Sequence, residues 1–259
     1  MAPREKMCSG RLAARKAMAL LCLGVAFFLA LAVGDAAAQK RFSKSYPAGK
    51  NVRLELMNRS GTITVEGWDR DEVSISAYLE APAAVISPRS LSGTIYINLV
   101  KDNQGRDEVG SVNFTVRVPY TSSVDIETLM GNLIVSNVRG GLVRAQITSE
   151  GDVTLTNIAA ASVHAQNGIG DIFFDGELQS GGNYRFISLR GNINLRIPFT
   201  SSFRLVATAP STRDISLGSF FNANMNFMGD GRRVIGRYGD GGASMTVTNQ
   251  RGSIKFIRR

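Results

Sequence analysis

Asp152 and Asp171 are the residues whose type and spacing come closest to an active site in this 259-residue chain. Each follows a glycine and precedes a short apolar alternation, in "GDVTLTN" (151–157) and "GDIFFDG" (170–176). If these segments form neighbouring strands in register, the two carboxylates lie about 4.8 Å apart. Retaining glycosidases use a similar separation, and mutual repulsion would raise one pKa and supply an acid. The enzymatic hypothesis is therefore a carbohydrate-active β-helix enzyme that uses stacked carboxylates.

The same carboxylates are also explained as members of a ladder of turns. The equivalent positions of two similar segments hold Asn132 and Asn192, so the position is not always acidic. Short amide and carboxylate side chains both hydrogen-bond nearby backbone at turns. An amide can replace a carboxylate in a turn but not in general acid catalysis. We therefore favour the turn and predict that the chain is not an enzyme and has no catalytic residue.

Metal chemistry finds little support in the sequence. Calcium requires several oxygen ligands, and neither the pair Asp152 and Asp171 nor the Gly-Asp-Gly segments 229–231 and 239–241 match the spacing of a calcium loop. We predict no metal-binding residue, although the sequence leaves open whether Asp152 and Asp171 bind a metal.

His164 is the only histidine, and "VHAQ" (163–166) repeats "VRAQ" (143–146), which aligns it with Arg144. We expect it to point outward. One histidine and no nearby cysteine leave no catalytic triad or zinc cluster, and the glycine-rich runs match no phosphate-binding loop. We therefore predict no cofactor and no cofactor-binding residue.

Two features are candidates for binding. Trp68, the sole tryptophan, is either an exposed platform for a sugar ring or, as we favour, a buried anchor. The segment "FFNANMNFMGDGRR" (220–233) is either a partner-binding loop or a hairpin that packs Phe220, Phe221 and Phe227 onto the core. The sequence does not decide which residues bind a ligand.

The elements that must position these residues are strands. Apolar residues alternate at period two in "VRLEL" (52–56), "ITVEGW" (63–68), "VNFTVRV" (112–118) and many similar stretches, with turn residues between them. This pattern predicts an all-β fold.

A repeat of about 20 residues organises these strands. Gly131, Gly151, Gly170 and Gly191 each open a similar segment, and more distant copies begin at Gly61, Gly93 and Gly252. A fixed period of this length predicts a β-solenoid, or β-helix-like stack, of short strands. We expect residues 39–120 to form an N-terminal β region that caps the stack. Residues 121–259 would form the solenoid repeats, with an irregular segment at 210–242.

The first 38 residues predict a signal peptide. Five basic residues precede an apolar run at 17–33, and Ala36 and Ala38 have the spacing that a signal peptidase reads. The alternative is an uncleaved membrane anchor, which would bring the chain near a membrane. Both cysteines, Cys8 and Cys22, lie in this segment. The remainder has 25 basic and 19 acidic residues, a net charge of +6, and we interpret the scattered charges as a solvated surface.

The chain resembles the putative adhesin family of bacterial exported β-strand-repeat proteins, which are similar to the head domain of auto-transporter adhesins. The stretches that carry the resemblance are "MNRSGTITVEGWDRDEV" (57–73), "VPYTSSVDIETLMGNLIVSNV" (118–138), "NINLRIPFTSSFRL" (192–205) and "GDGGASMTVTNQRGSIKF" (239–256). The resemblance implies a β-helix-like protein of the cell envelope, a domain of unknown function with no catalytic residues. The segment "APSTRDISLG" (209–218) departs from the family pattern.

These observations together predict a secreted, non-enzymatic cell-envelope protein, adhesin-like or a scaffold, that presents a rigid repetitive β surface for multivalent binding. Envelope or surface glycans or proteins are the expected partners, and nucleic acid is not. The location would be the periplasm, the outer membrane surface or the extracellular space.

Overall fold

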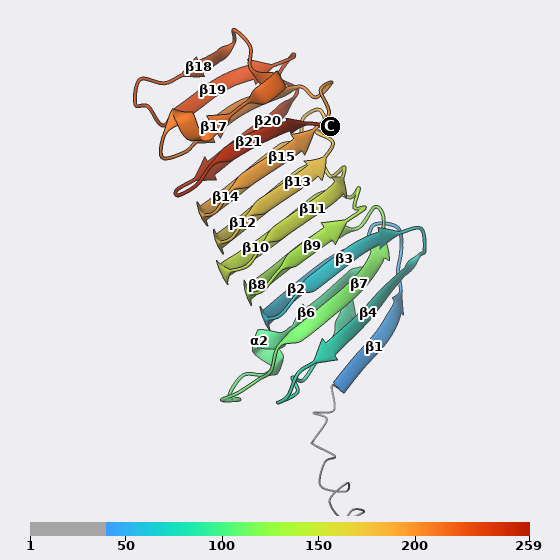
Figure 1. Cartoon of the computed structure of the whole chain (residues 1–259). Helices are drawn as coiled ribbons and strands as arrows, with labels where there is room; N and C mark the ends of the chain where they lie inside the picture. The colour runs from blue at the N-terminus through green and yellow to red at the C-terminus, as the bar shows by residue number, and fades with distance from the viewer. Residues whose placement is uncertain (1–39) are drawn as a thin grey trace, which may run out of the picture. The chain divides into compact units, whose positions relative to one another are not determined.

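Two large β-sheets face each other across one hydrophobic core in residues 40–259, the part of the chain that the computed structural model describes (Figure 1). The predicted signal peptide lies outside these residues. The all-β prediction is confirmed. Within residues 40–259, the regular structure apart from strands consists of the four-residue helix α2 (Leu99–Asp102) and two short 3-10 turns, η1 (Thr212–Asp214) and η2 (Gly218–Phe220).

Sheet A has ten strands, in the spatial order β1 (Lys40–Pro47), β4 (Glu72–Leu79), β7 (Val112–Pro119), β3 (Ile63–Trp68), β9 (Leu133–Ser136), β11 (Val153–Ile158), β13 (Ile172–Gly176), β15 (Ile193–Ile197), β21 (Ile254–Arg258) and β17 (Ile215–Ser216). Sheet B has eleven, in the order β18 (Met225–Phe227), β19 (Arg233–Tyr238), β16 (Phe203–Thr208), β20 (Ala243–Asn249), β14 (Asn183–Arg190), β12 (Ser162–Ile169), β10 (Leu142–Glu150), β8 (Ser123–Met130), β2 (Arg53–Ser60), β6 (Thr94–Asn98) and β5 (Arg89–Leu91).

The parallel strands are arranged in rungs, where a rung is one strand of sheet B and the strand of sheet A that follows it in the sequence. The rungs are β2–β3, β6–β7, β8–β9, β10–β11, β12–β13, β14–β15, β16–β17 and β20–β21. Neighbouring rungs pair in parallel in both sheets, as β10 does with β12 and β11 with β13. Antiparallel strands occur only at the ends of the described sheets, for example β1 on β4 and β19 on β16.

The order of the rungs in space differs from their order in the sequence at both ends of the stack. The rung β6–β7 lies outside β2–β3, and the rung β16–β17 lies outside β20–β21 (Figure 1). The rung β20–β21 therefore lies between two rungs that precede it in the sequence, β14–β15 and β16–β17. Residues before 121 supply β2–β3 and β6–β7, and the irregular segment at 210–242 contributes β17, β18 and β19.

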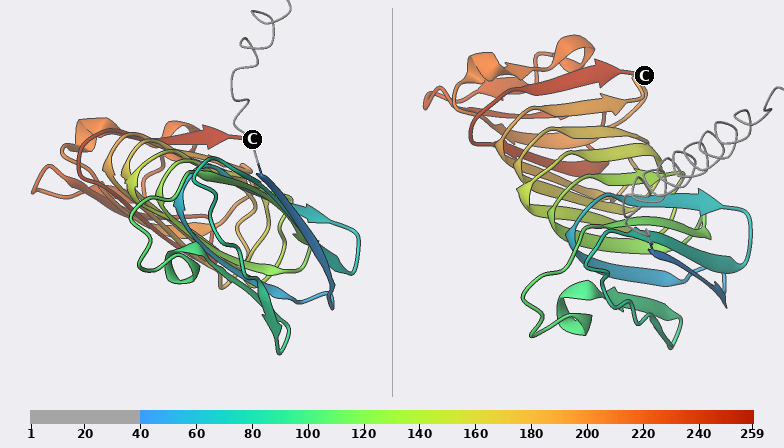
Figure 2. Two further views of the ribbon diagram at one scale, coloured as in Figure 1. Left: turned by 90° about the horizontal axis from the view of Figure 1, so that it is seen from below. Right: turned by 60° about the horizontal axis from the view of Figure 1, so that its bottom comes forward.

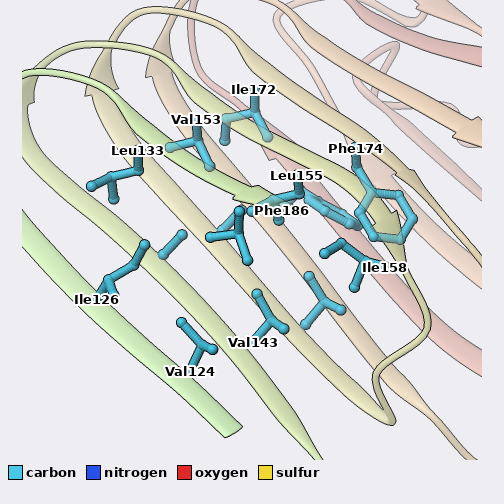
Figure 3. Packing of buried hydrophobic residues seen from close by; sticks show 14 of the residues in the cluster. Val124, Ile126, Leu133, Val143, Val153, Leu155, Ile158, Ile172, Phe174 and Phe186 are labelled. Atoms are coloured by element: carbon cyan, nitrogen blue, oxygen red, sulfur yellow. The ribbon is translucent and has the colours of Figure 1, made fainter. Parts of the chain in front are cut away.

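Figure 2 shows the two sheets facing each other, and alternation places the apolar residues between them (Figure 3). The two apolar residues that alternate after each glycine of the repeat are buried: Leu133 and Val135, Val153 and Leu155, Ile172 and Phe174, and Ile193 and Leu195. Successive rungs stack these side chains on one another, so that each rung covers the apolar face of the next.

An aromatic cluster closes the core at the end formed by β16, β20 and β21. Phe203 stacks on Phe256 with ring centroids 6.0 Å apart, and Phe220 packs edge-on against Tyr238 at 5.2 Å. Phe199 lies 6.2 Å from Phe220 at the margin of this cluster. Large rings suit this position because a terminal rung has no further rung to cover its apolar side chains.

One predicted repeat copy is wrong. The segment that begins at Gly93 forms the hairpin between β5 and β6, and β6 lies in sheet B. The true copies, which begin at Gly61 and Gly252, lie in sheet A with the other repeat segments. The short motif "GTIYIN" matched because a glycine before an alternating strand also suits a hairpin turn.

Candidate functional site

The glycine that opens each repeat lies in a ladder of turns that crosses from sheet B to sheet A. Its members are Gly61, Gly131, Gly151, Gly170, Gly191 and Gly252, all with positive φ. A Cβ added to Gly151 would overlap the carbonyl oxygen of Gly131, and one added to Gly170 would overlap that of Gly151. Glycine is therefore required here both by its backbone conformation and by the close approach of the next rung.

The residue after each glycine links its turn to the next one. The Oδ1 of Asn132 accepts a hydrogen bond from the backbone N–H of Asp152 at 2.9 Å, and the Oδ1 of Asp152 accepts one from Asp171 N–H at 2.8 Å. The Oδ1 of Asp171 in turn accepts the N–H of Asn192 at 2.7 Å. Amide and carboxylate oxygens make the same bond, which is the arrangement expected for a structural turn.

The structure thus brings Asp152 and Asp171 onto neighbouring rungs, as the repeat predicted, but not into a cavity. Both side chains are exposed, and neither lines any of the three grooves described below. Within residues 40–259 no three His, Cys, Asp or Glu side chains are grouped as a metal site would require. This geometry matches a turn ladder and offers no enclosed place for a sugar.

Both Gly-Asp-Gly segments are turns as well. The Oδ1 of Asp230 accepts the backbone N–H of Arg232 at 3.0 Å, and that of Asp240 accepts the N–H of Gly242 at 3.0 Å. The Ser202 hydroxyl also donates to Asp240, and this hydrogen bond is the main cause that lowers the pKa of the Asp240 carboxyl.

His164 lies on the outer face of sheet B. It is half-buried on β12, directly between Arg144 on β10 and Arg185 on β14, as its alignment with Arg144 predicted. Burial lowers the pKa of the imidazole, a hydrogen bond with Gln166 opposes this effect, and the two flanking guanidinium groups lower the pKa further. The Nε2 atom has no hydrogen-bond partner among the described residues.

Trp68 has little ring surface left for a sugar. Its indole N–H donates to the carbonyl oxygen of Glu72 at 2.8 Å, and the guanidinium groups of Arg70 and Arg117 lie over the ring, 5.0 and 5.8 Å from its centroid. The side chain is half-buried at the end of β3. Hydrogen bonding and cation–π contacts make it an anchor, but a half-buried one, whereas the sequence favoured a buried anchor.

The segment 220–233 combines both arrangements that the sequence left open. Phe220 is completely buried in the aromatic cluster, whereas Phe221 and Phe227 are 60 % and 49 % exposed. Part of the segment is the hairpin of β18 and β19. The segment therefore packs Phe220 of η2 onto the core and presents Phe221, which follows η2, and Phe227 of the hairpin to solvent.

Surface grooves in the described part of the chain include the following three. One, of about 460 Å³, lies among the loops around Glu177, Ser202 and Asp240. A second, about 370 Å³, lies where sheet B turns into sheet A, beside Leu189 and Arg190. The third, about 310 Å³, lies near Pro47 and Val52. None contains Trp68, His164 or the aspartates of the ladder. Over residues 40–259, no helix is long and apolar enough to cross a membrane.

Sequence reasoning missed a row of polar residues that supports the glycine turns. Asn58, Asn167 and Asn249 are buried, and each stands three residues before a glycine of the ladder. The Nδ2 of Asn249 donates to the carbonyl oxygens of Gly191 and Ser253, at 2.7 and 3.1 Å. The sequence carries this signal as an asparagine three residues before the glycine, in "NRSG", "NGIG" and "NQRG".

Comparison with known proteins shows similarity at the level of the fold. No protein-family model matches the chain, and no curated protein matches it. A solved structure described as a putative cell adhesion protein from Clostridium sporogenes is 13 % identical, covers 85 % of this chain and all of its own, and has a TM-score of 0.50. This fold is therefore shared with a solved structure of that description.

Two further structures have lower scores. A putative adhesin from Bacteroides fragilis is 10 % identical, with 85 % of this chain and 99 % of its own covered and a TM-score of 0.37. A putative lipid binding protein from Parabacteroides distasonis is 8 % identical, with 86 % and 98 % covered and the same TM-score. TM-scores of 0.37 are too low to show that these two proteins have the fold of this chain.

Proposed function

We propose that the chain is a secreted, non-enzymatic protein of the cell envelope, adhesin-like or a scaffold, built as a two-sheet β-solenoid. The proposal assigns residues 39–120 to an N-terminal capping region and residues 121–259 to the repeats, and treats residues 1–38 as a cleaved signal peptide. The location would be the periplasm, the outer membrane surface or the extracellular space. The neighbouring structure described as a putative cell adhesion protein fits this role.

The observation that carries the proposal is the register of the outward side chains. On sheet B one row crosses six neighbouring strands: Tyr96, Glu55, Asp125, Arg144, His164 and Arg185. On sheet A a parallel row contains Thr64, Ile134, Thr154, Phe173 and Asn194. Because neighbouring strands are about 4.8 Å apart, the sheet B row offers mainly charged groups, and the sheet A row offers polar and apolar groups, each at a regular spacing on a rigid support. Such a surface suits many weak contacts with a repetitive partner rather than one deep pocket.

The non-enzymatic part of the proposal is supported by the hydrogen bonding of the ladder. Asp152 and Asp171 each use a carboxylate oxygen to hold the next turn, and both face open solvent. If the chain instead cleaved glycans, Asp152→Asn and Asp171→Asn would abolish the activity. If the two aspartates serve only the turns, both variants keep a side-chain oxygen that accepts the hydrogen bond. Their free energy of unfolding then stays within about 0.5 kcal/mol of the wild-type value.

The test is a binding screen of residues 39–259 against surface glycans and fractionated bacterial envelopes, at low and high salt. We expect retention by at least one glycan or envelope fraction. Arg144→Gln or Arg185→Gln alone should weaken it by about threefold or less, because an exposed charge contributes little by itself. The double variant should weaken it more than either single one. Failure of every glycan and fraction to bind at both salt concentrations would leave only a structural role.

A further inference from the structure

Positive charge is concentrated at one end of the stack. Residues 183–259 contain 12 basic and 3 acidic residues, a net charge of +9, whereas residues 40–182 contain 13 basic and 16 acidic residues, a net charge of −3. The first segment forms β14 to β21, which are neighbours at one end of both sheets (Figure 1). The excess positive charge is therefore gathered at one end of the stack, although basic and acidic residues are both scattered along the sequence.

Few of these basic side chains are neutralised by ion pairs. Among the described residues, only Arg196 and Arg259 of this segment form salt bridges, and their partners, Asp175 and Glu177, belong to the preceding segment. By contrast, Arg53 pairs with two carboxylates near the other end of the stack. The positive potential of the segment 183–259 therefore faces solvent.

Exposed apolar side chains lie at the same end. We call Phe221, Phe227 and Met228 the apolar tip; they are 60 %, 49 % and 42 % exposed, and the two rings touch with centroids 6.2 Å apart. Figure 1 shows β18, which carries Phe227, as the outermost strand at this end. The two rings that touch form the contiguous part of this tip, and exposed apolar groups of this kind, surrounded by polar ones, mark interaction sites.

Basic residues flank the apolar tip directly. Arg232 and Arg233 follow it across the hairpin turn, where the N–H of Met228 donates to the carbonyl oxygen of Arg233 at 2.9 Å. Arg213 is next to the same turn, because the N–H of Thr212 donates to Gly231 at 2.8 Å. All three arginines are exposed. Asp214 and Asp230 lie beside the same turn, so this small area combines apolar side chains with three arginines and two aspartates, a net charge of +1.

The geometry of the tip distinguishes between possible partners. An anionic polymer would need only the arginines, or aromatic faces on which its rings could stack. The planes of Phe221 and Phe227 are tilted by 45° to each other, and Met228 has no aromatic face. A bilayer with anionic lipids satisfies both features, because its interface takes up apolar side chains and its headgroups attract cations.

We propose that this end of the stack docks on the surface of membranes that contain anionic lipids. Phe221, Phe227 and Met228 enter the interfacial region, and Arg213, Arg232 and Arg233 contact the headgroups. This contact is separate from the sheet faces to which adhesive binding is assigned above. The flat faces of the sheets then project away from the membrane contact.

The experiment measures sedimentation of the protein with vesicles of phosphatidylcholine alone and of a three-to-one mixture of phosphatidylcholine and phosphatidylglycerol. Residues 39–259 are used because they form one compact unit and lack the apolar leader, which would bind bilayers by itself. We expect binding to the mixed vesicles that weakens as salt is raised, and little binding to phosphatidylcholine. Circular dichroism confirms that each variant is folded.

Two double variants test the two halves of the contact. Arg232→Gln with Arg233→Gln should lower the partition coefficient about fivefold per charge, and Phe221→Ser with Phe227→Ser about tenfold or more. The matched controls lie at the other end of the stack: Lys40→Gln with Arg41→Gln, and Leu91→Ser, whose side chain is 67 % exposed. The controls should bind like the wild type.

Three results would overturn the proposal. One is an absence of binding to the mixed vesicles. Another is equal binding to both kinds of vesicle. The third is a partition coefficient that neither double variant changes. If the protein is retained by immobilised heparin but not by vesicles, the basic end binds an anionic polymer and the lipid assignment is wrong.

Discussion

At the scale of single residues, Gly151 shows why the repeat cannot vary freely. Its φ of +145° lies in a region that glycine adopts readily, and a Cβ would overlap the Gly131 carbonyl oxygen on the neighbouring rung. We expect Gly151→Ala to lower the free energy of unfolding by about 3 kcal/mol, through backbone strain together with the overlap. Urea denaturation followed by circular dichroism measures the change.

Gly49→Ala is the matched control for this substitution. Gly49 has no heavy atom within 4 Å of an added Cβ, and its φ is not positive. Its replacement should change the stability by about 0.5 kcal/mol or less. If both variants unfold at the same urea concentration, the ladder glycines are not required by packing.

His164 gives the molecule a pH-dependent stability. Its pKa in the folded chain is below the ordinary value of 6.5, mainly because of burial, with Arg144 and Arg185 contributing. The unfolded chain therefore binds the proton more tightly, and protonation favours unfolding. This contribution is absent well above pH 6.5 and lowers stability as pH falls through and below that value.

The measurement is the free energy of unfolding of the wild type and His164→Gln from about pH 7.5 to about pH 5.5. The difference between the two should shift against the wild type as the pH falls. Charged groups far from His164 contribute equally in both proteins, so the difference isolates the imidazole and its interactions with Arg144, Arg185 and Asp125. Parallel pH profiles would show that the proton on His164 does not affect folding.

At the scale of elements, the sequence specified the inward faces and the turns because both are local. Period two sets which side chains of β11 and β13 are buried, and a glycine followed by Asp or Asn sets the turn before each of them. The hairpin at Gly93 was misassigned for the same reason: its local pattern is that of a repeat strand, and only its partner in sheet B distinguishes it.

Strand β1 lies at an edge of sheet A, because among the described residues it pairs with β4 alone, and its free edge could pair with another chain. Lys44 lies on the inward side of this strand, opposite buried Ile75, with its ammonium 4.9 Å from the Tyr46 ring centroid. A charge on the inward side of an edge strand prevents a second sheet from adding to it, since the charge would be buried without a partner.

Lys44→Val should therefore make the protein self-associate through β1. Size-exclusion chromatography with light scattering over a range of protein concentrations would show dimers or larger species for this variant. Ser43→Val is the control, because the same side chain then lies on the outward side of the strand, and it should have the same mass in solution as the wild type. A Lys44→Val protein with the mass of the wild type at every concentration would refute this role of the lysine.

At the scale of the whole molecule, two features could not be read from the local pattern. The first is the insertion of β20–β21 between β14–β15 and β16–β17. All these rungs have the same apolar alternation, so the sequence pattern does not show which rung packs against which. The second is the surface formed by the basic segment and the apolar tip. The charge difference between residues 40–182 and 183–259 was available from counting, but its meaning depends on those strands being neighbours.

The insertion of β20 also predicts how the molecule opens. Ser244 to Asn249 pair with β14 on one side, and Ala243 to Thr248 pair with β16 on the other, so β20 is hydrogen-bonded on both sides along its length. If rungs had been added in sequence order, this strand would lie at the end of the stack and fray. We expect its amide protons to exchange about as slowly as those of β12 in the centre, whereas β18, paired only with β19, exchanges much faster. Native-state hydrogen exchange resolved by segment measures all three strands in one sample, and exchange of β20 at the rate of β18 would contradict the inserted order.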